Sequence, residues 1–224
     1  MKKIMLMAAM LVAVASAKAQ FEPGTFSIQP KMGGQAAWLS NMPKLTLAQG
    51  YELDKTPMAG FVIGAEAEYQ LTNMFSVAAG LNYSLQGSAW EDLSVKGAFD
   101  LKDSKFELGY ITVPVTANVY LFEGFAVKAG LQFGFLTNAK IKATAEASSA
   151  GINTKAETDM DMKDQCEKFD LSIPIGVSYQ FKVPITIDAR YQLGLTRLNK
   201  ESVPGVKNSK NSVFTLTVGY KFAL

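Results

Sequence analysis

Hydrophobic positions alternate with polar or small ones along most of the chain after Thr25. From residue 185 to 195, for example, Ile, Ile, Ala, Tyr, Leu and Leu alternate with Thr, Asp, Arg, Gln and Gly. A period of two is typical of a β-strand with one apolar and one polar face. The pattern predicts eight such strands, at residues 25–38, 58–69, 74–86, 106–120, 125–135, 167–180, 184–195 and 211–223.

The lengths of these strands and of their connections indicate a membrane barrel. Most of the strands reach the ~9–11 residues that a tilted strand needs to cross the hydrocarbon layer, and no apolar run after the N-terminus approaches the ~20 residues of a spanning helix. Short connections at 71–73, 121–124 and 181–183 alternate with long polar ones at 39–57, 87–105, 136–166 and 196–210. Outer-membrane barrels have short periplasmic turns and longer extracellular loops. We therefore predict an all-β, eight-stranded antiparallel up-and-down transmembrane β-barrel with periplasmic termini and extracellular long loops.

The N-terminus has the pattern of an export signal. Lys2 and Lys3 precede an apolar stretch at residues 4–15, and Ala17-Lys18-Ala19 matches a small-residue cleavage site. We expect a signal peptide at residues 1–19 and one outer-membrane β-barrel domain at residues 20–224. No Cys follows the cleavage site, so we expect no lipid anchor there.

Composition excludes several kinds of chemistry. The 224 residues carry a net charge of +2, which gives no sign of a nucleic-acid partner. There is no His, so a Ser-His-Asp triad and a His-based metal site are excluded. The single Cys166 has no disulfide partner and no activating neighbour, which indicates an incidental thiol in a loop. We predict no catalytic, cofactor-binding or metal-binding residue and no enzyme.

The polar faces of the strands carry four cations and four carboxylates, which we expect to point inward. An eight-stranded barrel has an interior just wide enough for its own side chains or one small ligand. Buried charges are costly unless they are paired. The balance of signs therefore predicts an ion-pair network that fills the lumen. Its predicted members are Lys31, Glu66, Glu68, Lys128, Asp170, Asp188, Arg190 and Lys221.

Aromatic residues gather near the predicted periplasmic ends of the strands, where an aromatic girdle lies in membrane barrels. Pro114 and Pro174 fall inside predicted strands, where each removes a hydrogen bond of the ladder, so we expect β-bulges there. Pro30 raises the same question in the first strand. The predicted girdle consists of Phe26, Tyr69, Phe75, Tyr120, Phe125, Tyr179, Phe181, Tyr220 and Phe222.

Several segments resemble the PorT-type outer-membrane β-barrel family, whose members are often labelled porin-family proteins. They include residues 60–69, 81–87 and 110–114, the Ala-Arg-Tyr-Gln-Leu-Gly-Leu segment at 189–195 and the Gly-Tyr-Lys-Phe ending at 219–222. The resemblance covers nearly the whole predicted mature chain. It implies an integral outer-membrane barrel and brings no catalytic residues with it. This chain adds Ala223 and Leu224 after the aromatic residue on which many members end.

The sequence leaves three functions open. The first is a non-enzymatic outer-membrane barrel with a plugged lumen, whose long loops serve envelope integrity, adhesion or docking to an envelope complex. The second is a porin for small solutes. The third is a soluble lipocalin-like barrel, which would need an apolar lumen and a polar exterior, the reverse of the pattern here. Expected partners are outer-membrane lipids, the barrel-assembly machinery during insertion, and an extracellular or envelope protein of unknown identity.

Overall fold

The computed structural model describes residues 21–224, apart from residues 42–43, 47–51, 96–98, 150–151 and 201–207. The expected signal peptide at residues 1–19 lies outside the described residues. Within the described part, no helix is long and apolar enough to cross a membrane. The helix found there is one short 3-10 turn, η1 (Lys163–Gln165).

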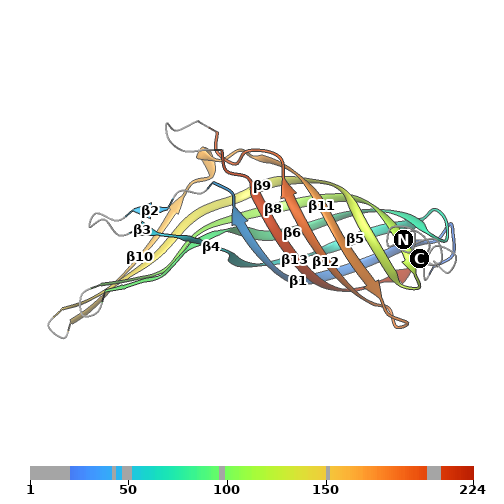
Figure 1. Ribbon diagram of the computed structural model, residues 1–224, viewed down its shortest axis with the longest axis horizontal. Coiled ribbons are helices and arrows are strands. Elements are labelled where there is room, and N and C mark those ends of the chain that lie inside the picture. Colours follow the sequence, from blue (N-terminus) through green and yellow to red (C-terminus); the bar gives the residue numbers. More distant parts are fainter. Residues whose placement is uncertain (1–20, 42–43, 47–51, 96–98, 150–151, 201–207) are drawn as a thin grey trace, which may run out of the picture.

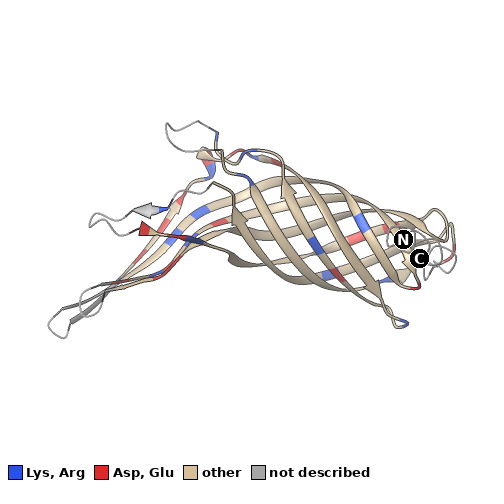
Figure 2. Ribbon diagram, in the orientation of Figure 1, with Lys and Arg blue, Asp and Glu red and all other residues tan. Residues whose placement is uncertain are grey.

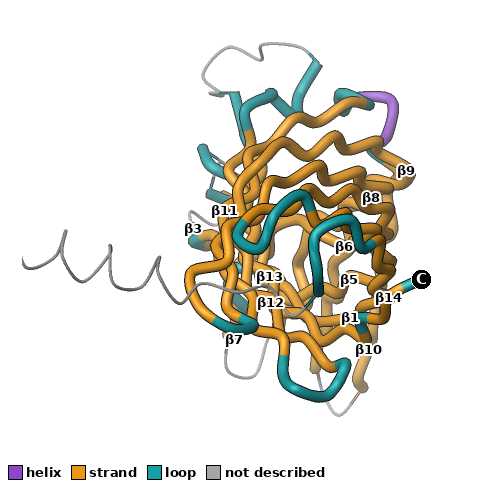
Figure 3. Tube along the Cα trace, turned by 90° about the vertical axis from the view of Figure 1, so that its right-hand side faces the viewer, coloured by secondary structure: helices purple, strands orange, loops and turns teal. Residues whose placement is uncertain are grey.

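Eight long strands form a closed antiparallel barrel, as predicted (Figures 1 and 3). Each strand pairs with the next long strand along the chain, and β13 pairs with β1 to close the ring. Both ends of the described chain lie at the end of the barrel that carries the short turns, which we call the short-turn end (Figure 1). The strands are β1 (Phe26–Leu39), β5 (Met58–Gln70), β6 (Phe75–Trp90), β8 (Phe99–Phe122), β9 (Phe125–Ser149), β11 (Phe169–Gln180), β12 (Ile185–Gly194) and β13 (Asn211–Tyr220).

At the opposite end of the barrel, which we call the long-loop end, the prediction of polar loops at 87–105 and 136–166 was wrong, because much of both segments forms strands. β8 and β9 continue beyond the barrel and stay paired as far as Phe99 and Ala147. β7 (Leu93–Val95) pairs with β8, and β10 (Ile152–Asp161) pairs with β9. We call this extension, formed by β7, β10 and residues 99–107 and 139–149, the arm (Figure 1). Shorter strands are β2 (Leu45–Thr46), β3 (Glu52–Leu53), β4 (Lys55–Thr56) and β14 (Phe222–Ala223).

The prolines inside the strands interrupt hydrogen bonding without the expected bulges. Pairing of β6 with β8 stops at Val115 and resumes at Thr112 in the same register, so Pro114 leaves a gap and no shift. Pairing of β11 with β9 skips Pro174 in the same way. Pro30 lies opposite the break between β13 and β14. The bulge prediction was therefore wrong, because the neighbouring pairs on both sides hold the register.

The outer wall of the barrel is apolar all the way round. Residues that point outward from the middle of the strands, such as Phe61, Leu81 and Leu216, have 46%, 61% and 50% of their surface exposed. Such a contiguous apolar surface marks contact with a membrane or a partner. A soluble lipocalin-like barrel has the opposite arrangement.

The predicted aromatic girdle is mostly exposed at the short-turn end. Phe125 is half-buried and stacks on Phe122, with 4.6 Å between the ring centroids. The girdle prediction was wrong for Tyr120, which is 3% exposed and points into the barrel. Its even number gives it the inward parity of Thr116 and Asn118 on the same strand. The exposed members are Phe26, Tyr69, Phe75, Tyr179, Phe181, Tyr220 and Phe222.

Candidate functional site

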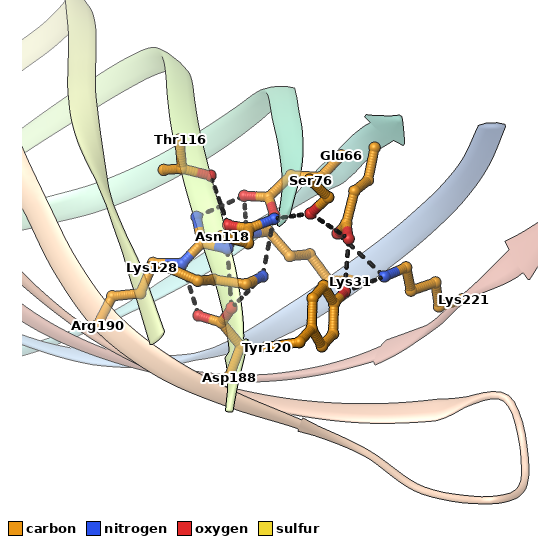
Figure 4. Close-up of polar contacts among 11 residues, drawn as sticks. Lys31, Glu66, Ser76, Thr116, Asn118, Tyr120, Lys128, Asp188, Arg190 and Lys221 are labelled. Atoms are coloured by element: carbon orange, nitrogen blue, oxygen red, sulfur yellow. Dashed lines mark hydrogen bonds and ion pairs between the residues drawn. The ribbon is translucent and has the colours of Figure 1, made fainter. Parts of the chain in front are cut away.

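The lumen near the short-turn end contains a layer of buried charges centred on Arg190 (Figure 4). The Arg190 guanidinium donates two hydrogen bonds to Glu66 on β5, at 2.5 Å to Oε1 and 2.7 Å to Oε2. It donates two more to Asp188 on its own strand, at 2.6 Å to Oδ1 and 2.8 Å to Oδ2. A guanidinium that binds two carboxylates in this forked way makes strong, directional contacts. Arg190 therefore joins β12 to β5 across the lumen.

Two lysines complete this cluster. Lys31 Nζ lies 2.5 Å from Glu66 Oε1. Lys128 Nζ lies 2.9 Å from Asp188 Oδ2 and 4.0 Å from Glu66 Oε2. Each carboxylate thus contacts at least two cations, so that side chains from β1, β5, β9 and β12 meet at one point.

A second cluster surrounds Glu68, which lies two residues nearer than Glu66 to the short turn after β5. Its partners Ser76, Tyr120 and Lys221 are labelled in Figure 4. Lys221 Nζ lies 3.0 Å from Glu68 Oε2, and the Tyr120 hydroxyl donates a 2.5 Å hydrogen bond to Oε1. Ser76 donates to the same oxygen at 2.7 Å and accepts a 3.0 Å hydrogen bond from Asn118 Nδ2. Glu68 is therefore held by one cation and two hydroxyls.

Glycines opposite the charged residues make room for these side chains. Gly80 pairs with Glu66 across β5 and β6, and a Cβ at Gly80 would lie 2.6 Å from Glu66 Cγ. Gly176 pairs with Arg190, and a Cβ there would lie 2.8 Å from Arg190 Cγ. Both contacts are shorter than real Cβ atoms make, so a larger residue at either position would displace a member of the layer.

An uncharged polar layer follows towards the long-loop end. Gln132 Nε2 donates to Gln192 Oε1 at 2.8 Å, and Gln35 Nε2 donates to Ser84 Oγ at 2.9 Å. The cavity between the two layers has a volume of about 10 Å³. A cavity needs roughly 10–15 Å³ to hold one water. The packed side chains thus leave space for about one water at this level.

An apolar cluster lies above the polar layer at the long-loop end. Cys166 belongs to it and is only 4% exposed. Burial raises the pKa of the Cys166 thiol to about 11, so the protonated form dominates at neutral pH. The cluster consists of Leu39, Leu108, Tyr110, Leu136, Ala139, Cys166 and Leu198.

The buried thiol should react slowly with alkylating reagents. We expect iodoacetamide at pH 8 to modify Cys166 in the folded protein on the order of 100-fold more slowly than an exposed thiol with the usual pKa of ~8.5. Mass spectrometry of timed samples measures the rate, and urea-unfolded protein serves as the control. Equal rates in folded and unfolded protein would show that Cys166 is accessible.

Seven of the eight charged residues predicted for the lumen lie in these two clusters. Asp170 is the exception: it lies near the long-loop end and accepts a 2.6 Å hydrogen bond from Thr196 Oγ1. Among the described residues, the ion pairs of the charged layer do not include Asp170. The alternation of residues along the strand predicted that Asp170 faces inward. It did not predict the position of Asp170 along the barrel axis.

Tyr120, Ser76 and Asn118 belong to the charged layer but were not predicted as its members. All three have the inward parity of their strands, which was the available signal. Across the described residues, no three acidic or Cys side chains come together as a metal site would require. Glu66 and Glu68, two carboxylates on one strand face, are both bound to cations in the lumen.

The apolar wall and the polar lumen define a small transmembrane β-barrel. The chain belongs to the family of the outer membrane protein beta-barrel domain, whose model matches residues 18–199. This membership indicates an outer-membrane location. Comparison with curated proteins gives no match.

Similar solved structures are also outer-membrane barrels. Ail, the attachment invasion locus protein of Yersinia pestis, is 20% identical over 89% of this chain and 99% of that chain, with a TM-score of 0.45. Neisserial surface protein A is 16% identical over 88% and 97%, with a TM-score of 0.43. OprG from Pseudomonas aeruginosa is 13% identical over 94% and 100%, with a TM-score of 0.38. At this distance the similarities carry no information on function.

Proposed function

We propose that this protein is a non-enzymatic outer-membrane barrel whose filled lumen passes no solute and whose role is carried by the arm and the long loops. The observation that carries the proposal is the charged layer, in which Arg190 bridges β12 and β5. Every charged side chain in this layer is at most 7% exposed and has an opposite charge within 3.0 Å. Removing such a pairing to open a path would leave buried charges unpaired, at a high cost in free energy.

The absence of His, together with the binding of Glu66 and Glu68 by cations, favours a structural role for the lumen over catalysis. The resemblance to PorT-type proteins agrees with a structural role for the lumen, and it stays a prediction. Expected partners are outer-membrane lipids and, during insertion, the barrel-assembly machinery.

We place the short-turn end in the periplasm and the long-loop end outside the cell, as is usual for outer-membrane barrels. In this orientation the arm extends from the cell surface (Figure 1). Figure 2 marks charged residues of both signs along the arm. A polar projection of this kind is suited to adhesion or to docking of an envelope complex.

Planar-bilayer recordings test the closed lumen. Purified protein should give no steady conductance steps in 1 M salt, because the cavity between the charged and the polar layer has space for about one water. A 16-stranded porin inserted under the same conditions is the positive control, since such barrels contain an aqueous channel. Steady conductance that scales with the number of inserted barrels would instead favour the small-solute porin.

A further inference from the structure

The strand β10 forms a free edge of the arm. β10 pairs with β9 on one side, and no described strand pairs with its other side. The side chains of residues 155–161 are exposed. An edge strand of this length is a template for pairing with another chain.

The hydrogen-bond pattern shows which residues of β10 face outward along the edge. Met162 N–H donates to Ala139 O at 2.9 Å, which continues the register in which Met160 faces Ile141. In an antiparallel pair, residues that bond to the neighbour alternate with residues whose N–H and C=O point away from it. Even-numbered residues of β10 therefore bond to β9. The N–H and C=O groups of residues 153, 155, 157, 159 and 161 point to the free side.

The sequence of β10 is complementary to that of a second, antiparallel copy of β10 when the two Ala156 residues face each other. Read outward from Ala156, Lys155 corresponds to Glu157, and a Thr at position 154 corresponds to Thr158. Position 153 is Asn against Asp159, and position 152 is Ile against Met160. Opposite charges, two Thr residues and two apolar residues are each favourable as cross-strand pairs. An antiparallel copy of β10 thus offers Lys155, Glu157 and Thr158 partners of these kinds.

Charge selects this register over its neighbours. Pairing about Glu157 would place Glu157 directly against itself, and pairing about Lys155 would place Lys155 against itself. Like charges directly opposite each other destabilise a strand pair. Pairing about Ala156 also places residues 155 and 157 of the two copies opposite each other, so that their outward N–H and C=O groups form two hydrogen bonds per pair.

We propose that the arm is a homophilic docking site, in which β10 of one copy pairs antiparallel with β10 of a second copy about Ala156. The two copies are related by a two-fold axis, the usual symmetry of a self-complementary contact. The arm leaves the long-loop end at an angle and points away from the short-turn end (Figure 1), so reversing β10 also reverses the general direction of the barrel. The two barrels therefore lie in facing membranes. This placement rests on the proposed function, which puts the arm outside the cell.

Docking would replace the exposed ion pair within each copy by ion pairs between the two copies. Lys155 Nζ now lies 2.7 Å from Glu157 Oε1 of its own strand, and these side chains are 56% and 70% exposed. Exposed ion pairs contribute ~0–1 kcal/mol. A contact of this size is weak for one pair of molecules, but many copies on two facing surfaces raise the overall strength of attachment.

Cross-linking tests the register. In the proposed pair, the Cα atoms of the two Ala156 residues are about 4.5 Å apart, as in a non-hydrogen-bonded antiparallel pair. This separation allows a disulfide. The control is Thr158→Cys on the same face, because the two copies of residue 158 would be separated by four residues, or about 14 Å. Tagged protein in one set of phosphatidylcholine vesicles is mixed with untagged protein in another under oxidising conditions. We expect at least ten times more tagged-untagged dimer for Ala156→Cys than for Thr158→Cys.

Charge reversal tests specificity in the same vesicles, read as vesicle clustering by light scattering. Lys155→Glu and Glu157→Lys vesicles should each fail to cluster alone, because like charges then face each other. A mixture of the two should cluster, and so should the double variant Lys155→Glu/Glu157→Lys, which has the wild-type net charge. Clustering of the mixture without clustering of the double variant would indicate general charge attraction and overturn the proposal.

Equal cross-linking of the two Cys variants, or dimers formed only within one vesicle, would also overturn the inference. Trypsin applied to intact cells separates this result from the proposed function. If the arm is cleaved on cells but the vesicles do not dock, the homophilic site is wrong while the outward orientation of the arm stands. If the arm is protected on cells, the orientation itself is wrong, and docking between facing membranes falls with it.

Discussion

Replacing Arg190 with Ala should lower the free energy of unfolding by about 3–5 kcal/mol, the usual effect of removing one partner of a buried ion pair. Arg190 donates four hydrogen bonds to Glu66 and Asp188. Without the guanidinium, the two carboxylates keep only Lys31 and Lys128 as cationic partners in the cluster. Urea unfolding in lipid vesicles, followed by tryptophan fluorescence and by the gel shift on boiling, measures the difference.

Two further variants separate charge from geometry in this experiment. Arg190→Lys keeps the charge but loses the forked contact, so we expect an intermediate loss of stability. Arg197→Ala is the matched control, because Arg197 is exposed near the long-loop end. A change of less than ~0.5 kcal/mol for Arg190→Ala, as is usual for surface substitutions, would show that the layer does not stabilise the barrel.

The period of two was sufficient to predict the barrel and the inward face of its charged residues. Each of these features depends on side-chain direction along a single strand, which is local. Which cation meets which carboxylate depends on the stagger of strands around the closed barrel, a property of the whole ring. For this reason the contact between Arg190 and Glu66, residues 124 positions apart in the chain, could not be read from the sequence.

Two predictions were wrong although the alternation of residues in the sequence indicated the right answer. Tyr120 was assigned to the girdle from its place at a strand end, although its parity points inward. Much of the arm was predicted as loops because the segments at 87–105 and 136–166 are long and polar. Ala, Lys and Glu, which are frequent in the second segment, are also depleted in strands. Residues 139–147 nevertheless alternate strictly between Ala or Ile and Lys, Thr or Glu. Continued pairing between β8 and β9 overrides the weak local preference.

A Lys substituted for Leu81 should destabilise the protein in lipid by about 2–4 kcal/mol, the effect of a cation on the lipid-facing side near the bilayer midplane. Leu81 lies on β6, points outward and is 61% exposed, so the protein itself offers little to shield the ammonium group. The matched control is Leu71→Lys, because Leu71 is 51% exposed in the turn before β6 at the short-turn end. There the effect should be ~0–1 kcal/mol, since cost falls towards the interface.

Both Lys variants are measured by urea unfolding in vesicles and again in a detergent micelle. The difference between Leu81→Lys and Leu71→Lys depends on depth in the bilayer, so it should shrink in the micelle, where water approaches the wall more closely. If both variants lose the same stability in vesicles, β6 does not cross the membrane with Leu81 near its centre. A loss at Leu81 that exceeds the loss at Leu71 only in vesicles places the apolar wall of the barrel in the hydrocarbon layer, with the charged layer inside it.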